Sequence, residues 1–162
     1  MNYADAPTRE AAWLATADSL GVLTVTAGGP FHIVQAYWPR TPARTKRGLY
    51  VQRAPGRSAE LDRFAAQMQI LRTQLLVKAW WPIGNGAGSL EAEQAAFDVA
   101  LGTVLARIAG PLGDKTHGGR FLSVAEDPAQ ITVNLDDPEH APTVGALRAS
   151  IAYWADDPDT PG

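Results

Sequence analysis

The chain has 162 residues, no cysteine and a formal net charge of −3, with 46% apolar and 19% charged residues. This composition is typical of one globular domain, and it excludes a disordered chain, a disulfide framework and thiolate metal sites. No apolar run approaches the roughly 20 residues that cross a bilayer, and the first residues, MNYADAPTRE, lack the pattern of an export signal. We therefore expect no membrane segment and assembly in a reducing cytoplasm.

Charge is distributed unevenly along the chain. Residues 1–81 hold 10 Lys and Arg against 5 Asp and Glu, whereas residues 82–162 hold 4 against 12. Two oppositely charged ends or faces can pair between copies in a head-to-tail ring. The alternative is that folding interleaves the two halves, in which case no such asymmetry survives.

The first part of the chain predicts one helix followed by short extended segments. The helix covers about 8–20, with Pro7 in its first turn. Extended segments follow at Val22–Thr26 and Phe31–Trp38, separated by a Gly-Gly-Pro turn. Gly48–Arg53 predicts a further strand.

A long strand is the clearest prediction in the middle of the chain. Residues 54–68 leave two alternatives, a short helix near Ser58 or an extension of the next strand. From Gln69 to Trp81 the pattern has a period of two, which predicts a half-buried strand. Its apolar face consists of Leu71, Thr73, Leu75, Val77, Ala79 and Trp81.

A long helix is predicted over Ser89–Ala109, with Ser89 as its N-cap and two glutamates in its first turn. Apolar residues at helical spacing define one buried face, namely Leu90, Phe97, Leu101, Val104, Leu105 and Ile108. Gly102 lowers helix stability, and we expect close packing on a sheet to compensate for it.

Three further strands are predicted, a short one at Phe121–Ala125 and two amphipathic ones at Ala129–Asp136 and Val144–Ala155. Strands with one polar face are typical of antiparallel sheets. The expected fold is therefore α+β, an antiparallel or mixed sheet with one long helix packed on one face and an additional N-terminal helix. We expect a single domain over 1–162, with extended termini at 1–5 and 156–162.

The motifs that could carry chemistry lack essential parts. Gly84–Ser89 precedes a helix and could hold a phosphate, but no lysine follows, and Glu91 and Glu93 would repel the ligand. Asp114 and His117 have a metal-like spacing without a convincing further ligand. We interpret two carboxylate pairs as solvated turns, Asp136-Asp137 and Asp156-Asp157. The sequence therefore predicts no enzymatic activity, no cofactor and no metal.

The loop Pro39–Arg47, extended by Arg53 and Arg57, is the best candidate for nucleic-acid binding. A contact between ring neighbours is favoured because the chain is acidic overall, while direct DNA contact stays open. Trp80 and Trp81 alternate along one strand, so one of them points away from the core and can anchor an interface. The interface candidates are Arg44, Lys46, Arg47, Trp80, Trp81 and Trp154.

The order of these elements resembles that of the tail terminator proteins of long-tailed (siphovirus-type) bacteriophages. The shared order is an N-terminal helix, two extended segments, a long strand ending in Ala-Trp-Trp-Pro at 79–82, one long helix and two closing strands. Residues 146–157 are similar to the closing strand of that family, and Gly48–Arg53 to an inner strand. The resemblance spans 6–157 and is one of pattern and element order, without an invariant catalytic signature.

The resemblance implies a structural virion protein. Such proteins form a homo-oligomeric ring, a hexamer in that family, which caps the tail tube and meets the connector or stopper protein of the head. Viral DNA passes through the bore, and the location is the neck of the virion, with no membrane involved. A bore that does not retain DNA needs like charge, and the candidates for its wall are Glu126, Asp127, Asp136, Asp137 and Glu139. The alternatives are another neck protein such as a head-closure (stopper) protein, a small ligand-binding α+β domain that uses Gly84–Ser89, and a DNA-binding accessory protein.

Overall fold

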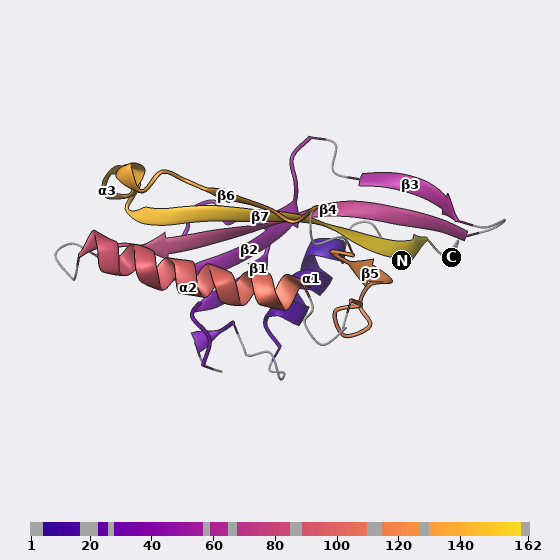
Figure 1. Cartoon of the computed structure of the whole chain (residues 1–162), viewed down its shortest axis with the longest axis horizontal. Helices are drawn as coiled ribbons and strands as arrows, with labels where there is room; N and C mark the ends of the chain where they lie inside the picture. The colour runs from indigo at the N-terminus through magenta and orange to yellow at the C-terminus, as the bar shows by residue number, and fades with distance from the viewer. Residues whose placement is uncertain are drawn as a thin grey trace.

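The computed structural model describes residues 5–16, 23–25, 28–56, 59–64, 68–84, 89–109, 115–126 and 130–159. Within them, seven strands form one mixed sheet, and the helices α1 (Ala6–Leu14) and α2 (Leu90–Ala109) pack on one of its faces (Figure 1). The α+β fold, the long helix on one face and the N-terminal helix are as predicted.

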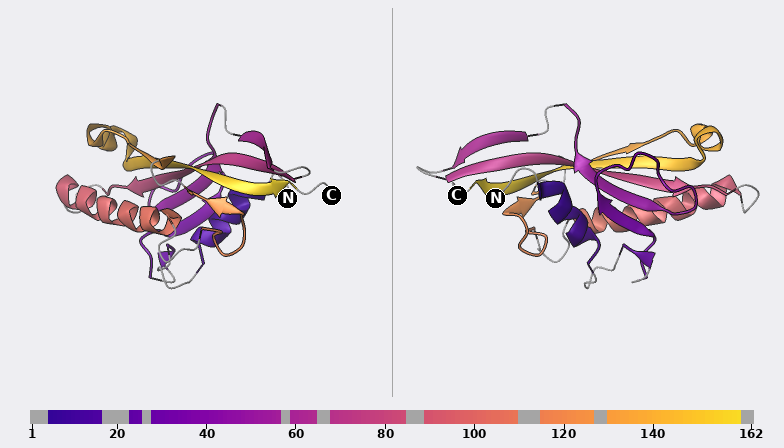
Figure 2. Two further views of the ribbon diagram at one scale, coloured as in Figure 1. Left: turned by 45° about the vertical axis from the view of Figure 1, so that its right-hand side comes forward. Right: turned by 180° about the vertical axis from the view of Figure 1, so that it is seen from behind.

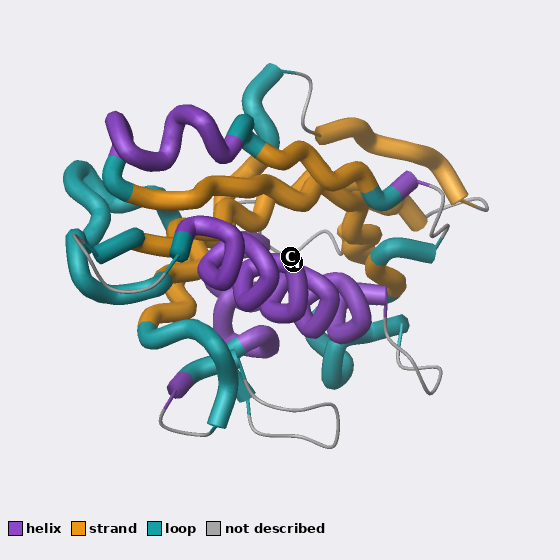
Figure 3. The backbone as a smooth tube through the Cα atoms, turned by 60° about the vertical axis from the view of Figure 1, so that its left-hand side comes forward, coloured by secondary structure: helices purple, strands orange, loops and turns teal. Residues whose placement is uncertain are grey.

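The final strand of the sequence lies in the interior of the sheet. The strands are β1 (Ile33–Ala36), β2 (Gly48–Arg53), β3 (Ala59–Phe64), β4 (Met68–Pro82), β5 (Ser123–Val124), β6 (Thr132–Leu135) and β7 (Ala146–Asp159). Their order is β1-β2-β4-β7-β5, with β3 on β4 and β6 on β7. Only β1 and β2 pair in parallel. The tube in Figure 3 shows the strands as one layer with α2 along its side.

The core lies between the sheet and the two helices. The predicted face of β4 is buried from Thr73 to Trp81, and β7 adds its own alternate residues, Ile151 and Tyr153 among them. From α2, Phe97 and Val104 complete this layer. Each such large apolar side chain contributes about 1.5–3 kcal/mol when it is removed from water.

Both helices differ in detail from the prediction. In α1, Pro7 lies in the first turn as expected, but the helix ends at Leu14, where the Thr16 hydroxyl donates to the carbonyl oxygen of Trp13 at 2.6 Å. Residues 17–22 lie outside the described part of the chain. The expected packing at Gly102 is wrong, because the residue is exposed and a Cβ there would meet nothing within 4 Å.

Several strand predictions also need correction. Of the predicted segment Val22–Thr26 the structure describes residues 23–25, and these form only an isolated bridge between Thr24 and Phe31. The ambiguous stretch before β4 contains the strand β3, which forms an antiparallel pair with β4. The helix α3 (Ala141–Val144) ends in a left-handed Gly145 with φ of 86°, so β7 begins one residue later. It then continues to Asp159, and residues 156–159 belong to the sheet instead of forming a free terminus.

Candidate functional site

The face of the sheet away from α2, called here the open face, carries the polar side chains of the central strands. The cross-strand register aligns Tyr50, Lys78, Ser150 and Asn134 in one row. The connection between β1 and β2 arches over this side, as the view from behind shows (Figure 2), and Trp38 packs edge-on against Tyr50 with ring centroids 5.1 Å apart. Burial beneath this connection raises the pKa of the Tyr50 hydroxyl. The chain's own segment thus partly covers the open face.

Trp80 and Trp81 lie on opposite faces of β4, as expected from their alternation. Trp80 faces the open side, where its indole N–H donates to the carbonyl oxygen of Ala43 at 3.0 Å and its ring lies 6.1 Å from that of Trp38. Trp81 is only 3% exposed and packs against Phe97. The prediction of Trp81 as a surface anchor is therefore wrong for the folded subunit, because its side chain belongs to the core.

The basic segment separates into exposed and anchored residues. Arg44 and Lys46 are exposed, and neither forms an ion pair with a described residue. Arg47 lies with its guanidinium carbon 4.5 Å from the centroid of the Trp81 ring, and its backbone N–H donates to Nδ1 of His32 at 3.1 Å. Arg47 therefore covers the edge of the core, while Arg44 and Lys46 remain available to a partner.

A shallow groove of about 380 Å³ lies on the open face between Trp38 and the strand β6. Lys78 forms one wall, with its ammonium nitrogen 4.9 Å from the centroid of the Trp38 ring. The remaining lining residues are Ala79, Asn134, Leu135, Asp136, Arg148, Ala149 and Ser150. This mixture of aromatic and charged groups suits the docking of a side chain or segment.

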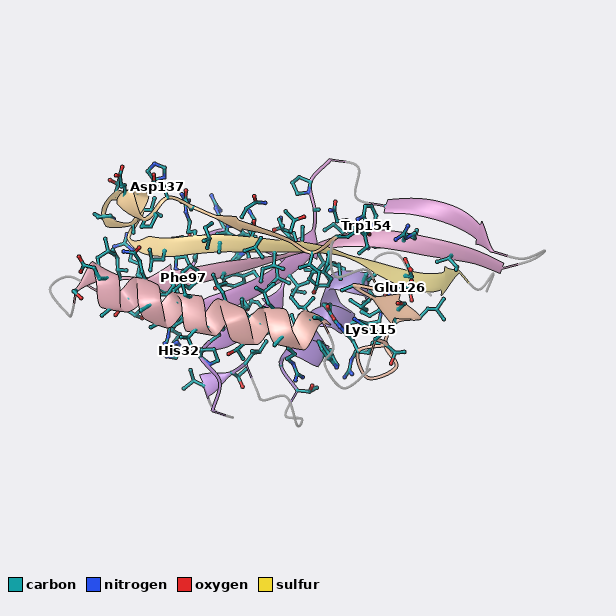
Figure 4. The ribbon with its side chains drawn as sticks, in the orientation of Figure 1. His32, Phe97, Lys115, Glu126, Asp137 and Trp154 are labelled. Carbon is teal, nitrogen blue, oxygen red and sulfur yellow. The ribbon has the colours of Figure 1, made fainter. Side chains whose placement is uncertain are left out.

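Trp154 lies on the open face, farther along β7 than Arg148 and Ser150 of the groove, and Figure 4 shows it well away from Asp137. The guanidinium carbon of Arg72 lies 5.6 Å from the centroid of its ring, and Nε of Arg72 donates to Asp156 at 2.9 Å. These residues and Glu126 line a small cleft of about 120 Å³. Trp154 is half-buried and engaged within its own subunit, so it offers less surface than an isolated outward tryptophan.

Asp136, one of the predicted bore residues, is compensated within the subunit. Its carboxylate accepts a hydrogen bond from Nη2 of Arg148 at 2.5 Å and lies 3.1 Å from Nδ1 of His140. The hydrogen bonds from Arg148 and then His140 lower the pKa of this carboxyl. A carboxylate paired in this way contributes little repulsion toward DNA.

The other predicted bore residues that the structure describes lie in two separate places. Asp137 and Glu139 are exposed in one corner, where the Asp137 side chain accepts from the Glu139 backbone N–H at 3.0 Å and caps the short helix η5 (Pro138–His140). Glu126 lies toward the other end of the long axis (Figure 4), and Asp127 lies outside the described residues. A single acidic wall made of all five residues is therefore not a feature of one subunit.

The strand β6 departs most clearly from its predicted environment. The alternation in Ala129–Asp136 predicts one dry face, yet all four residues of β6 are exposed, including Val133 at 39% and Leu135 at 61%. Both apolar side chains share the α2 side of the sheet with Ile151 and Ala149, their partners on β7. The apolar face predicted for this strand is real, but α2 does not reach far enough across the sheet to cover it.

A buried polar network joins α1, α2 and β7. Glu10 accepts a hydrogen bond from the Tyr153 hydroxyl, and its other carboxylate oxygen lies 2.7 Å from Nδ1 of His117. Nε2 of His117 lies 3.0 Å from the carbonyl oxygen of Ile108. The side chains of Glu10, His117 and Tyr153 are all 0% exposed. No sequence pattern marks this cluster, because its members come from distant segments.

Every polar group of this network has a partner. Both ring nitrogens of His117 face oxygen atoms, a carboxylate oxygen of Glu10 at Nδ1 and the Ile108 carbonyl oxygen at Nε2. Burial and the nearby Glu10 raise the pKa of Tyr153 well above 10, which keeps its hydroxyl a donor. With both ring nitrogens engaged, His117 is not available as the metal ligand that its spacing to Asp114 could indicate, and Asp114 lies outside the described residues. The cluster therefore holds α1 in place and contacts no solvent.

Stacking and charge extend this anchoring of α1. The Trp13 ring stacks on His117 with centroids 3.6 Å apart, and Nη2 of Arg107 donates to the Trp13 carbonyl oxygen at 2.8 Å. Arg9 pairs with Asp157 at 2.5 Å between Nη2 and Oδ2. Burial raises the pKa of Asp157 against the opposing effect of Arg9. The interpretation of Asp156-Asp157 as a solvated turn is thus wrong, since Asp157 is buried and both residues are in β7.

Among the described residues, no group of three or more His, Asp or Glu is arranged to hold a metal ion. None of the described helices is both long and apolar enough to cross a membrane. In the comparisons with known proteins, no protein-family model matches the chain, and no curated protein matches it.

Proposed function

We propose that this protein is a structural subunit that assembles into a closed ring of identical copies, and that the ring is the tail terminator of a long-tailed bacteriophage. The observation that supports this proposal best is a separation of charge across the sheet. Between Asp18 and Glu60 the chain has six Lys and Arg and no acidic residue, whereas between Arg120 and Arg148 it has five Asp and Glu and no Lys or Arg.

The strand order places the strands of these two regions on different sides of the central pair β4 and β7. The basic region contributes β1 and β2 at one side of the sheet, and the acidic region contributes β5 and β6 at the other, with β4 and β7 between them. The strands of the two regions do not interleave, and the connection between β1 and β2 faces the acidic side across the groove on the open face. Opposite charge on two different surfaces favours head-to-tail contacts, which form a ring when the rotation between neighbours closes.

The mechanical role is supported by the architecture. An N-terminal helix, a long strand, a long helix and closing strands are the elements on which the resemblance to tail terminators rests, whereas β3 is not part of that pattern. The strands β4 and β7 pair along almost their whole length as a stiff central pair. In the proposed role, loops at the two ends of the ring contact the tail tube protein and the connector or stopper protein, and viral DNA passes between the subunits through the bore. We assign no carboxylate to the bore wall, because Asp136 is paired and Glu126 lies apart from the acidic corner.

Mass and electron microscopy test this function directly. Native mass spectrometry and negative-stain images of the purified protein, alone and with tail tubes, should show rings that sit at tube ends and stop further addition of tube protein. Rings that bind the head connector but not the tubes would transfer the proposal to a head-closure protein. A strictly monomeric protein that turns over a small molecule would refute the structural role.

A further inference from the structure

The free edge of β6 has the properties of an unfinished interface. Within the described residues β6 pairs only with β7, so the backbone N–H and C=O groups on its other side are open to a partner. Natural edge strands are commonly protected by lysine, proline or a bulge, and the sequence Thr-Val-Asn-Leu of β6 has none of these. Val133 and Leu135 add exposed apolar surface beside this edge.

Acidic groups adjoin the same edge. Asp137 and Glu139 follow β6 directly and are exposed, whereas the charge of Asp136 is compensated by Arg148. A partner for this surface must therefore offer positive charge next to an apolar or aromatic group.

The segment 37–46, which leaves the sheet after β1 at the edge opposite β6 and then crosses the open face as far as Trp80, offers this combination. Arg40, Arg44 and Lys46 are exposed, and none of them contacts a charged partner among the described residues. Tyr37 is 49% exposed and has an unusual positive φ of 69°, held by a hydrogen bond from its N–H to the carbonyl oxygen of Val51 at 2.7 Å. Tyrosine with neighbouring arginine is a composition enriched in protein interfaces.

The register of the sheet brings the complementary groups to matching levels. Val51, to which Tyr37 is bonded, continues across the sheet through Val77 and Ile151 to Val133. In the same way Gly48, which directly follows the basic segment, lies in the row of Trp80 and Arg148, next to Asp136. The aromatic Tyr37 thus lies at the level of Val133 in β6. The basic segment ends at the level of the acidic residues that follow β6.

We propose that the β6 edge with Asp137 and Glu139 docks against Tyr37 and the basic residues 40–46 of the next copy. The inference deepens the proposed ring by naming its subunit interface. A rotation about a ring axis leaves height along the axis unchanged, so the β6 edge of one copy and the β1 side of the next, from which Tyr37 and the basic segment start, meet at matching levels in every copy. A twofold contact through either surface would instead place the acidic edge against a second acidic edge, or the basic segment against a second basic segment. Repulsion between like charges disfavours such a contact.

Charge reversal tests this interface. Arg44→Glu with Lys46→Glu makes both surfaces acidic, and Asp137→Lys with Glu139→Lys makes both basic. Each variant alone should raise the protein concentration at which rings form by at least about tenfold, because like charges then face each other. An equimolar mixture should restore assembly, with the two variants alternating around rings of even number. Asp98→Lys with Glu91→Lys, the same change in charge on the exposed face of α2, is the control and should assemble like the wild type.

Cross-linking gives a second readout that does not depend on the charge change. The chain has no cysteine, so Lys46→Cys and Glu139→Cys introduce unique thiols. With a short bis-maleimide linker, the chain with both changes should give a ladder of covalent oligomers up to the ring size, whereas each single variant should stay monomeric. Covalent dimers from a single variant, or rings that form equally well in every variant, would refute the proposed interface but not the proposed ring. A wild type that is monomeric at all concentrations and on tail tubes would overturn interface and function together.

Discussion

Replacement of Glu10 by alanine should destabilise the fold far more than its replacement by glutamine. Alanine leaves His117 without the group that faces Nδ1 and leaves the Tyr153 hydroxyl without its acceptor, both at 0% exposure. Each buried polar group that loses its hydrogen-bond partner costs about 1–3 kcal/mol, and Glu10→Ala leaves two such groups, on His117 and Tyr153. Against a total stability of about 5–15 kcal/mol, Glu10→Ala should remove a large fraction of it.

Glutamine, in contrast, can satisfy every group in the network. Its carbonyl oxygen accepts from Tyr153, its amide donates to Nδ1, and a neutral His117 still donates from Nε2 to the Ile108 carbonyl oxygen. We therefore expect Glu10→Gln to cost no more than about 1–1.5 kcal/mol, the net value of an ordinary hydrogen bond.

Urea unfolding followed by circular dichroism measures both costs, provided that the slope of the transition stays unchanged. Glu91→Ala on the exposed side of α2 is the control and should stay within about 0.5 kcal/mol of the wild type. If the free energy of unfolding of Glu10→Ala lies within about 1 kcal/mol of the wild-type value, the network does not hold α1 in place. If the glutamine variant is as unstable as the alanine variant, the hydrogen-bond accounting is wrong.

Three further changes test other parts of the structure. Burial and Glu10 raise the pKa of Tyr153, so its contribution to stability is present below about pH 10 and lost above it. We expect Tyr153→Phe to lose less stability than the wild type at alkaline pH, and unfolding midpoints between about pH 8 and 11 measure this. Gly102→Ala should raise the unfolding free energy by about 0.5–1 kcal/mol, since the helical site is exposed and open, and an unchanged or lower value in urea unfolding would contradict this. Arg148 lowers the pKa of Asp136, so the contribution of this carboxylate to stability is present at neutral pH and lost as the pH falls below about 4. Thermal melts should therefore show that the stability of Asp136→Asn changes less with pH in the acid range than that of the wild type.

The predictable parts of the fold are those in which local pattern and environment agree. The period of two in β4, the bounds of β2 and the Ser89 cap of α2, which accepts from the Ala92 N–H at 3.2 Å, follow from residue types and spacing alone. The pattern of β6 was equally clear, but burial depends on how far α2 reaches across the sheet, and no local pattern encodes that reach. For the same reason the extension of β7 to Asp159 was not predicted, since its pairing partner β4 lies far away in the sequence.

The candidate site was less predictable than the fold. Alternation shows that Trp80 and Trp81 point in opposite directions, but which of them is buried depends on the side that α2 covers. The exposed cations Arg44 and Lys46 stand out by composition, whereas the environment of Arg47 depends on Trp81, a residue distant in the chain. The His117 network was missed because hydrogen bonds between such distant residues leave no periodic signal.

The position of β7 between β4 and the acidic strands has a consequence for synthesis of the protein. As the chain leaves the ribosome, β1 to β4 can pair with one another, but one side of β4 stays uncovered until the much later β7 has emerged. During that interval the nascent chain exposes a long apolar strand to any neighbouring chain, which favours aggregation and chaperone binding. Expression at lower temperature, where hydrophobic association between exposed strands is weaker, should therefore improve the soluble yield.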